Sequence, residues 1–380
     1  MSVTEFNLPT KVIFGEGAFD RLGEEAAKLG RRALIVSGQK TMRKLGLLDK
    51  AADMLEGVGL EAILFDKIEP NPRVATVDAG AAIARKEKID LIIALGGGSA
   101  MDAAKGIAIA TAADKSVWHY ITTRDDPPGK VPVLIMVPTV SASGSEVNSG
   151  AVITDWVSHQ KRVLSRPALQ PKIALVDPEL TLSLPLAPTL AGGVDIFCHA
   201  VEPYITASHP EFLNDGWRES MLRTVVKYLP IVRADLHNRE ARRALAWAST
   251  MACSSFASLG GGDGGMTLHG IEHPLSGLYD ITHGDGLAAL LPAWLADLSI
   301  VRAERIKLLG ERVFGSSDGK AAVEDWLKSV GMRSRLESLG ISKEKFPELA
   351  NMARISSQWI KYNPTPLEPE DIERIYRMAY

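Results

Sequence analysis

Short apolar runs of strand-forming residues alternate with helical patterns through the first half of this chain. The predicted strands cover residues 33–36, 62–65, 91–95, 133–137 and 173–176. The predicted helices between them cover residues 19–29, 44–57, 74–86 and 100–112. Strands that recur with helices between them favour a parallel, doubly wound α/β sheet with helices on both faces. Such a sheet binds ligands at the carboxyl ends of its strands.

The pattern changes after residues 177–185, where two prolines interrupt the chain. The remainder predicts helices almost throughout, most clearly at residues 218–228, 240–259, 286–298, 302–313 and 322–330. A chain of 380 residues also exceeds the size at which a single hydrophobic core stops growing. We therefore expect an α/β dinucleotide-binding domain over residues 1–184 and an all-helical, metal-binding and catalytic domain over residues 185–380.

The composition narrows the class of protein. Apolar residues make up 46% of the chain, which is enough to bury a large core. A formal net charge of −3 gives no basic field for nucleic acid or an acidic membrane surface. The first residues lack the pattern of a secretion signal, and no uncharged apolar run of 18 residues follows. We expect a cytoplasmic protein without membrane or nucleic-acid partners, whose Cys198 and Cys253 stay as thiols.

Asp195 and His199 stand four residues apart, and three more histidines cluster downstream at His269, His273 and His283. If the first segment is helical, Asp195 and His199 lie on one face about one turn apart, as two ligands of one metal ion must. One carboxylate with several imidazoles suits Fe(II) or Zn(II). From spacing alone His273 would join His269 as a ligand. Pro274 weakens that argument, because the residue before a proline avoids helical geometry.

Residues 94–105 hold a candidate phosphate-binding loop at the end of a predicted strand. Three consecutive glycines let backbone amides approach phosphate oxygens, and Ser99 could cap the following helix, whose dipole favours an anion. The alternative is an ordinary tight turn between strand and helix. Residues 138–148 leave a second strand and are dense in hydroxyls, so they could line the same site or form a polar loop. Lys161 could add positive charge there.

Residues 260–265 also match the glycine spacing of a dinucleotide fingerprint. They follow a predicted helix, whereas the fingerprint needs a preceding strand. We therefore predict a flexible loop near the downstream histidines rather than a nucleotide site.

Five segments taken together resemble the iron-containing, group III alcohol dehydrogenase family, in the family's order and spacing: residues 96–105, 138–148, 177–185, 193–202 and 269–284. The resemblance implies an N-terminal nucleotide-binding domain, a helical C-terminal domain, and a cleft between them for a divalent metal and NAD(P). It places the metal ligands at Asp195, His199, His269 and His283. His273 then lies beside the metal, where it relays a proton or orients its neighbours by hydrogen bonding.

The same resemblance predicts which residues contact the cofactor. They are Gly38, Asn71, Gly97, Gly98, Ser99, Asp102, Thr139, Val140, Ser145, Asn148 and Lys161. The chain departs from the family's commoner Pro-Thr-Thr-Ala-Gly-Thr-Gly-Ser-Glu-Val-Thr loop at Val140, Ser141, Ala142, Ser143 and Asn148. Asn148 is more similar to the branch of butanol, 1,3-propanediol and aldehyde-reducing enzymes. The departures bear on the substrate and on cofactor contacts rather than on the reaction class.

The expected reaction is reversible hydride transfer between NADP(H) and a primary alcohol or its aldehyde, catalysed by a metal-dependent dehydrogenase. The strand predicted at residues 33–36 leads into Ser37 and Gly38 without a carboxylate. In the family, NAD-specific members carry Asp at the position of Gly38, so glycine favours NADP, and Gln39 or Lys40 could bind its 2′-phosphate. The alternative is that Gly38 only permits the turn, which leaves NAD possible.

Other functions fit the same residues. A glycerol- or polyol-type Zn(II) dehydrogenase and a metal-free reductase of the same superfamily are the nearest alternatives. A non-catalytic metal-binding storage or sensor protein is more remote, since the chain keeps both a glycine loop and a full ligand set. We expect a homodimer, the commonest form of soluble enzymes.

Overall fold

The computed structural model describes residues 7–256 and 264–380, which form two compact units. The sheet unit comprises Leu8–Val140 and Gly144–Ser183. The helical unit comprises the described residues of Leu184–Tyr380, joined by Ser141–Ser143 and by Asn7.

Six parallel strands build the sheet unit, in the order β1-β8-β5-β4-β2-β3. Their bounds are β1 (Lys11–Phe14), β2 (Arg32–Gly38), β3 (Glu61–Ile68), β4 (Leu91–Gly96), β5 (Val133–Pro138) and β8 (Ile173–Val176). The predicted parallel sheet is confirmed, and its five predicted strands lie within β2, β3, β4, β5 and β8. The sequence reading missed β1, which has only four residues, and the antiparallel hairpin of β6 (Gly150–Asp155) and β7 (Gln160–Ser165).

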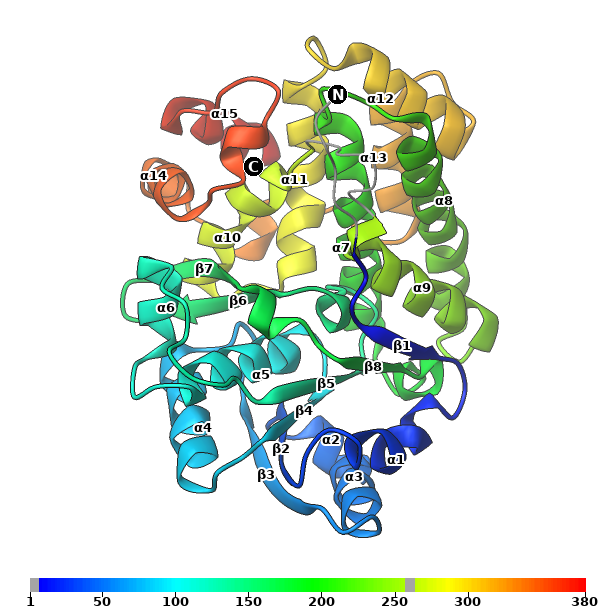
Figure 1. Cartoon of the computed structure of the whole chain (residues 1–380). Helices are drawn as coiled ribbons and strands as arrows, with labels where there is room; N and C mark the ends of the chain where they lie inside the picture. The colour runs from blue at the N-terminus through cyan, green and yellow to red at the C-terminus, as the bar shows by residue number, and fades with distance from the viewer. Residues whose placement is uncertain (1–6, 257–263) are drawn as a thin grey trace. The chain divides into compact units, whose positions relative to one another are not determined.

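Helices cover both faces of this sheet, as Figure 1 shows. They are α1 (Leu22–Ala26), α2 (Thr41–Lys44), α3 (Leu47–Glu56), α4 (Val74–Lys86), α5 (Gly98–Thr111) and α6 (Val117–Thr123). Leu34 and Val36 of β2 pack into the core under α4 and α5, whereas Ala33 and Ile35 pack into the core under α1 and α3. Successive strand residues point to opposite faces, so a strand covered on both sides is apolar throughout.

Two predicted helices of the sheet unit are shorter than expected. The helix predicted at residues 44–57 divides at Gly46, whose φ of 68° is left-handed and ends α2 before α3 begins. The helix predicted at residues 19–29 starts as a 3₁₀ turn, Ala18–Arg21, and its α-helical part ends at Ala26.

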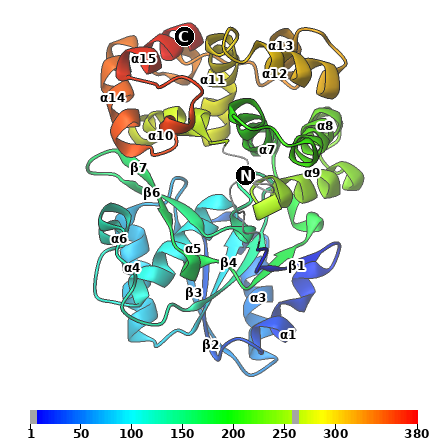
Figure 2. The same ribbon diagram turned by 45° about the horizontal axis from the view of Figure 1, so that its top comes forward.

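The helical unit packs its helices around one hydrophobic core. They are α7 (Leu186–Thr206), α8 (Phe212–Ala234), α9 (Arg239–Ala252), α10 (Thr267–Tyr279), α11 (His283–Asp297), α12 (Ala303–Leu309), α13 (Gly319–Ser329), α14 (Phe346–Ser356) and α15 (Pro369–Ala379). Within this unit α11 packs against α7, α10 and α15. Figure 2 shows α10, α14 and α15 on one side of α11 and α7, α8 and α9 on the other. Among the described residues, none of the helices combines the length and apolar character that a membrane crossing needs.

Two expectations about this unit were wrong. The helix predicted at residues 240–259 ends at Ala252. The loop predicted at residues 260–265 is a separate case, because most of it lies outside the described residues. Pro274 was expected to disfavour helical geometry at His273, yet α10 continues through both. The buried residues of α10, from Thr267 to Gly277, pack into the core, and this tertiary packing outweighs the single backbone hydrogen bond that the proline removes.

A buried ion pair holds the carboxyl end of α7. Arg305 of α12 donates from Nε to the carbonyl of Tyr204 at 2.9 Å, and its guanidinium pairs with both carboxylate oxygens of Asp215 in α8. Free carbonyls and the helix dipole both favour a cation at this end of a helix. The contact therefore ties α8 and α12 to the helix that carries Asp195.

We predict that Asp215→Ala lowers the free energy of unfolding by about 3–5 kcal/mol, because it leaves the buried Arg305 guanidinium without its carboxylate. Denaturant titration monitored by circular dichroism would measure the change. Asp325→Ala removes an exposed pair with Lys328 and should change stability little. Equal effects of the two substitutions would contradict this reading of the Arg305 contact.

Candidate functional site

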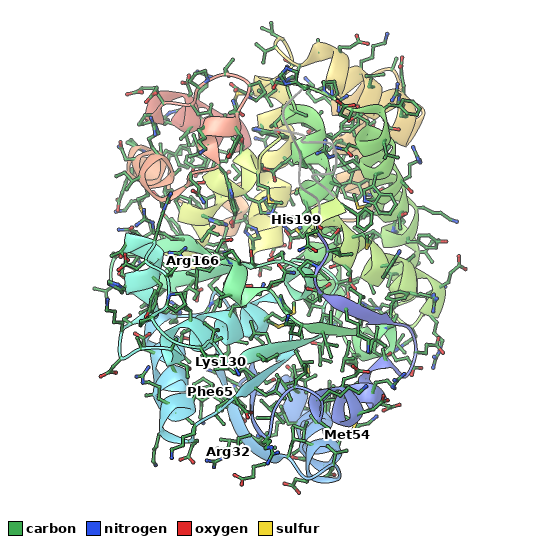
Figure 3. The ribbon with its side chains drawn as sticks, in the orientation of Figure 1. Arg32, Met54, Phe65, Lys130, Arg166 and His199 are labelled. Atoms are coloured by element: carbon green, nitrogen blue, oxygen red, sulfur yellow. The ribbon has the colours of Figure 1, made fainter. Side chains whose placement is uncertain are left out.

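Helix α7 carries the first two candidate metal ligands. Its residues from Thr189 to Thr206 are all buried, as expected for a helix that is apolar on every side. Asp195 and His199, one turn apart, share a face, with His199 Nδ1 3.7 Å from Asp195 Oδ1. Figure 3 labels His199 on this helix. The helix that the sequence spacing required is therefore present.

The other two candidate ligands come from α10 and the first turn of α11. His269 Nε2 lies 3.3 Å from Asp195 Oδ1, and His283 Nε2 lies 4.0 Å from the same oxygen. The His269 ring stands between the other two, with centroids 4.5 Å from His199 and 5.0 Å from His283. Gly284 allows the start of α11 to lie close against α7, because a Cβ at this position would lie 2.2 Å from the carbonyl oxygen of Ala191 in α7.

Two glutamates contact His269 and His283, each at the ring nitrogen that does not face Asp195. Glu202 of α7 contacts Nδ1 of His269, and Glu272 of α10 contacts Nδ1 of His283. The His199 ring hydrogen bonds to the backbone of Ala142. The sequence reading missed both glutamates, because each faces a histidine on a different helix, and spacing along one helix carries no signal for such a pair.

The electrostatics of the cluster favour an ionised carboxylate. Burial alone would raise the pKa of Asp195, but the imidazoles of His199, His269 and His283 hold it below its usual range. Burial lowers the pKa of His199 to about 3, against the attraction of Asp195. For His269, burial is outweighed by the nearby Glu202 and Asp195, which raise its pKa to about 10.

The donor set fits a divalent metal ion. Asp195, His199 and His269 each offer a donor atom within 4.8 Å of the others. His199 Nδ1 is buried and has no hydrogen-bond partner among the residues that the structure describes. One carboxylate with several imidazoles is a donor set that suits Fe(II) or Zn(II).

A second group of possible donors, Glu272, His273 and His283, lies equally close together. In this group Glu272 is already engaged by two hydrogen bonds, one with Ser276 Oγ and one with His283 Nδ1. We therefore read Glu272 as an acceptor for His283 rather than as a ligand, which leaves His283 Nε2 directed toward Asp195.

His273 lies one turn after His269 in α10 and is buried. Its ring centroid is 5.6 Å from that of His283 and 5.5 Å from that of Trp359. The rings of Trp359 and His269 stand nearly perpendicular to each other, with their centroids 6.4 Å apart. The sequence reading missed this tryptophan, which stands in a segment without regular pattern near the carboxyl end of the chain.

The glycine loop of the sheet unit lies where β4 ends and α5 begins. Gly97 is the N-cap of α5, and Gly98 and Ser99 form its first turn. The prediction that Ser99 caps the helix was wrong, because the helix starts at Gly98 and no side chain caps it. Backbone amides of a helix's first turn lack intrahelical acceptors and attract an anion, so the loop keeps its phosphate-binding chemistry.

Lys105 of α5 organises the loops beside this glycine turn. It is fully buried and donates to Ser145 Oγ at 2.8 Å and Asn148 Oδ1 at 3.2 Å. Asp102 accepts from Ser145 Oγ at 2.7 Å and from the amide of Val152 at 2.9 Å. Burial raises the pKa of Asp102. Lys105 was not among the predicted site residues, although it lies inside the candidate phosphate-binding loop of residues 94–105.

The remaining predicted cofactor residues lie at strand ends or in loops of the sheet unit. Thr139 follows β5 and donates its amide to Gly96, and Val140 would contact a Cβ placed on Gly97. Lys161 of β7 donates to Asn71 Oδ1 at 2.9 Å, and Asn71 has a left-handed φ of 52°.

Gly38 is the last residue of β2. Its backbone is not left-handed, and a Cβ there would meet only the carbonyl oxygen of Ile68, at an ordinary 3.7 Å. The turn therefore does not require glycine, which weighs against the alternative that Gly38 only permits the turn.

Comparison with known proteins identifies the family. The model of the iron-containing alcohol dehydrogenases matches residues 9–178, and that of the family's C-terminal region matches residues 189–380. The chain is 34% identical to NADH-dependent butanol dehydrogenase A of Clostridium acetobutylicum, covering 99% of both chains. It is 29% identical to an NADPH-dependent aldehyde reductase of Escherichia coli, covering 91% of this chain and 92% of that one.

A solved structure of similar fold supports the same family assignment. The crystal structure of an NADH-dependent butanol dehydrogenase A from Thermotoga maritima matches with a TM-score of 0.94 and 31% identity. The match covers 100% of this chain and 99% of that one. The chain therefore belongs to the iron-containing alcohol dehydrogenase family, and it is an alcohol dehydrogenase that uses a metal ion and a nicotinamide cofactor.

Proposed function

We propose that this alcohol dehydrogenase interconverts a primary alcohol and its aldehyde with NADP(H), at a divalent metal ion held by Asp195, His199, His269 and His283. The convergence of three imidazoles on one buried carboxylate is the observation that carries the proposal. Fe(II) is the proposed ion, with Zn(II) as the alternative, because the donor set suits both. The same convergence argues against a metal-free reductase, which would have no use for it.

The two units divide the work in this proposal. Residues 1–184 bind the cofactor through the glycine loop, and residues 185–380 bind the metal. The first-turn amides at Gly98 and Ser99 hold phosphate oxygens. Lys105 and Asp102 keep the loop of Ser145 in place through the hydrogen bonds described above.

The chemistry of hydride transfer needs charge beside the substrate oxygen and a path for a proton. When bound, the metal ion supplies that charge and the nicotinamide accepts or gives the hydride. Asp195 and the three imidazoles fix the position of the charge, because each stands on a buried helix or at its first turn. His273 exchanges the hydroxyl proton, because its ring is buried beside that of His283 and an imidazole can both accept and donate a proton.

The preference for NADP(H) rests on Gly38. The names of the relatives point both ways, with NADH in the butanol dehydrogenases and NADPH in the Escherichia coli reductase. A carboxylate at this strand end would bind the ribose hydroxyls and repel a 2′-phosphate, and Gly38 offers none. Gln39 and Lys40 follow it and are exposed. Gln39 Nε2 donates to the carbonyl of Lys67 at 3.4 Å, and Lys40 offers an ammonium group to a phosphate.

Replacing Asp195 or His269 with Ala should remove bound metal and lower kcat about a thousandfold or more, since several kcal/mol of charge stabilisation are lost. Elemental analysis and an NADPH absorbance assay with short aldehydes measure both effects. His237→Ala, an exposed histidine between α8 and α9, should keep metal and activity. Full activity in a metal-free Asp195 variant would refute the proposal and point to the metal-free reductases.

The substitution His273→Ala should lower kcat about 100-fold while metal stays bound, because it removes a proton-transfer group but no ligand. Metal content and the pH profile of kcat should be measured on the same preparation. Loss of the metal in this variant would show that His273, and not one of the four proposed residues, is a ligand.

The substitution Gly38→Asp should shift the ratio of kcat/KM for NADPH over NADH toward NADH by about tenfold or more, through repulsion of the 2′-phosphate. Gly38→Asn is the matched control, because it has the same size without the charge. A wild type that already prefers NADH, or equal ratios in the Asp and Asn variants, would refute the assignment.

A further inference from the structure

Two buried glutamates contact the proposed metal ligands but are not ligands themselves. Glu202 and Glu272 are both fully buried. An ionised carboxylate inside an apolar core is costly unless hydrogen bonds or charges compensate it. The contacts of each glutamate therefore indicate what it does.

Glu202 fixes both the backbone and the ring of His269. Its Oε2 accepts from the amides of Leu268 at 2.6 Å and His269 at 3.2 Å, in the first turn of α10. These amides have no acceptor within the helix. Its Oε1 meets Nδ1 of the His269 ring. No lysine or arginine of residues 7–256 and 264–380 forms an ion pair with Glu202, so its charge faces the histidine.

Glu272 connects α10 to α11. It stands three residues after His269, and its Oε2 meets Nδ1 of His283 at the start of α11. Its Oε1 accepts from Ser276 Oγ, one turn further along α10. Gly286 leaves room for this carboxylate, because a Cβ there would lie 2.5 Å from Oε1. The carboxylate is therefore held on both oxygens and directed at one ring nitrogen.

We propose that Glu202 and Glu272 are positioning residues of the metal centre. Each accepts the Nδ1–H of its histidine, which fixes the ring and its tautomer so that Nε2 is the free donor. Both Nε2 atoms face Asp195 Oδ1, at 3.3 Å for His269 and 4.0 Å for His283. The inference rests on the proposed metal site, which it extends to two residues that touch neither metal nor substrate.

The chemical consequence concerns metal affinity. A carboxylate on Nδ1–H makes the imidazole a stronger donor at Nε2, and its removal weakens metal binding about 10–100-fold in such sites. The two negative charges also offset the positive charge that remains when a dication has Asp195 as its one anionic ligand. Glutamine at either position keeps an oxygen acceptor of the same size but lacks the charge.

The test is titration of metal-free protein with Co(II), followed through its visible absorption, and with Zn(II) in competition. The variants are Glu272→Gln and Glu202→Gln. The matched control is Glu219→Gln, a buried glutamate of α8 that binds the Tyr204 hydroxyl rather than a histidine. We expect both site variants to bind Co(II) about 10–100-fold more weakly, with an altered Co(II) spectrum, and the control to match wild type.

The outcomes separate this inference from the metal site itself. Wild-type affinity and spectrum in Glu272→Gln would overturn the positioning role while Asp195→Ala still lost the metal. A wild type that binds no metal, or an Asp195→Ala variant that binds as tightly as wild type, would overturn the metal site and the inference together. Glu202 also supports the backbone of α10, so if Glu202→Gln fails to fold, Glu272→Gln decides.

Discussion

The burial of one carboxylate is the constraint on which the helical unit depends. Asp195 sits in an apolar core where an uncompensated negative charge would cost several kcal/mol. Three imidazoles converge on it from three helices and hold its pKa below its usual range. Together with Asp195, these imidazoles form a donor set that would bind a divalent cation.

The helices around Asp195 contain locally unfavourable features that this geometry requires. Helix α10 runs through Pro274, and the start of α11 passes so near α7 that only glycine fits at position 284. The carboxyl end of α7 is held by the Arg305 guanidinium, itself paired with Asp215. Donors fixed on packed helices in this way keep their positions better than donors on loops. A metal ion held so rigidly would act on a substrate oxygen without the protein having to reorganise.

In the sheet unit, the sequence pattern predicted some elements and missed others. Apolar runs predicted the central strands, because a strand buried on both faces is apolar at every position, as in β4. The four-residue β1 and the hairpin of β6 and β7, whose apolar residues are interrupted by polar ones, carry no such signal and were missed. The glycine loop was found from its composition. The cap at Ser99 was misplaced, because where a helix starts depends on backbone geometry that three glycines leave open.

The site could be predicted as far as local spacing and family resemblance reach. Asp195 and His199 follow from spacing on one helix, whereas His269 and His283 needed the resemblance, since they join the cluster only through tertiary packing. Glu202 and Glu272 lie within two segments that carry the family resemblance, residues 193–202 and 269–284, but their spacing gave no sign of a role. Each glutamate acts through a contact with a histidine on another helix. A single sequence does not show which helices pack against each other.

The most direct test of the account is anomalous diffraction from crystals of the metal-loaded protein, measured on both sides of the absorption edge of the bound metal. We expect one strong peak within bonding distance of a carboxylate oxygen of Asp195 and one ring nitrogen each of His199, His269 and His283. We also expect Glu202 and Glu272 to stay in contact with the Nδ1 atoms of His269 and His283. A peak among Glu272, His273 and His283 without Asp195, or no peak at all in active crystals, would contradict it.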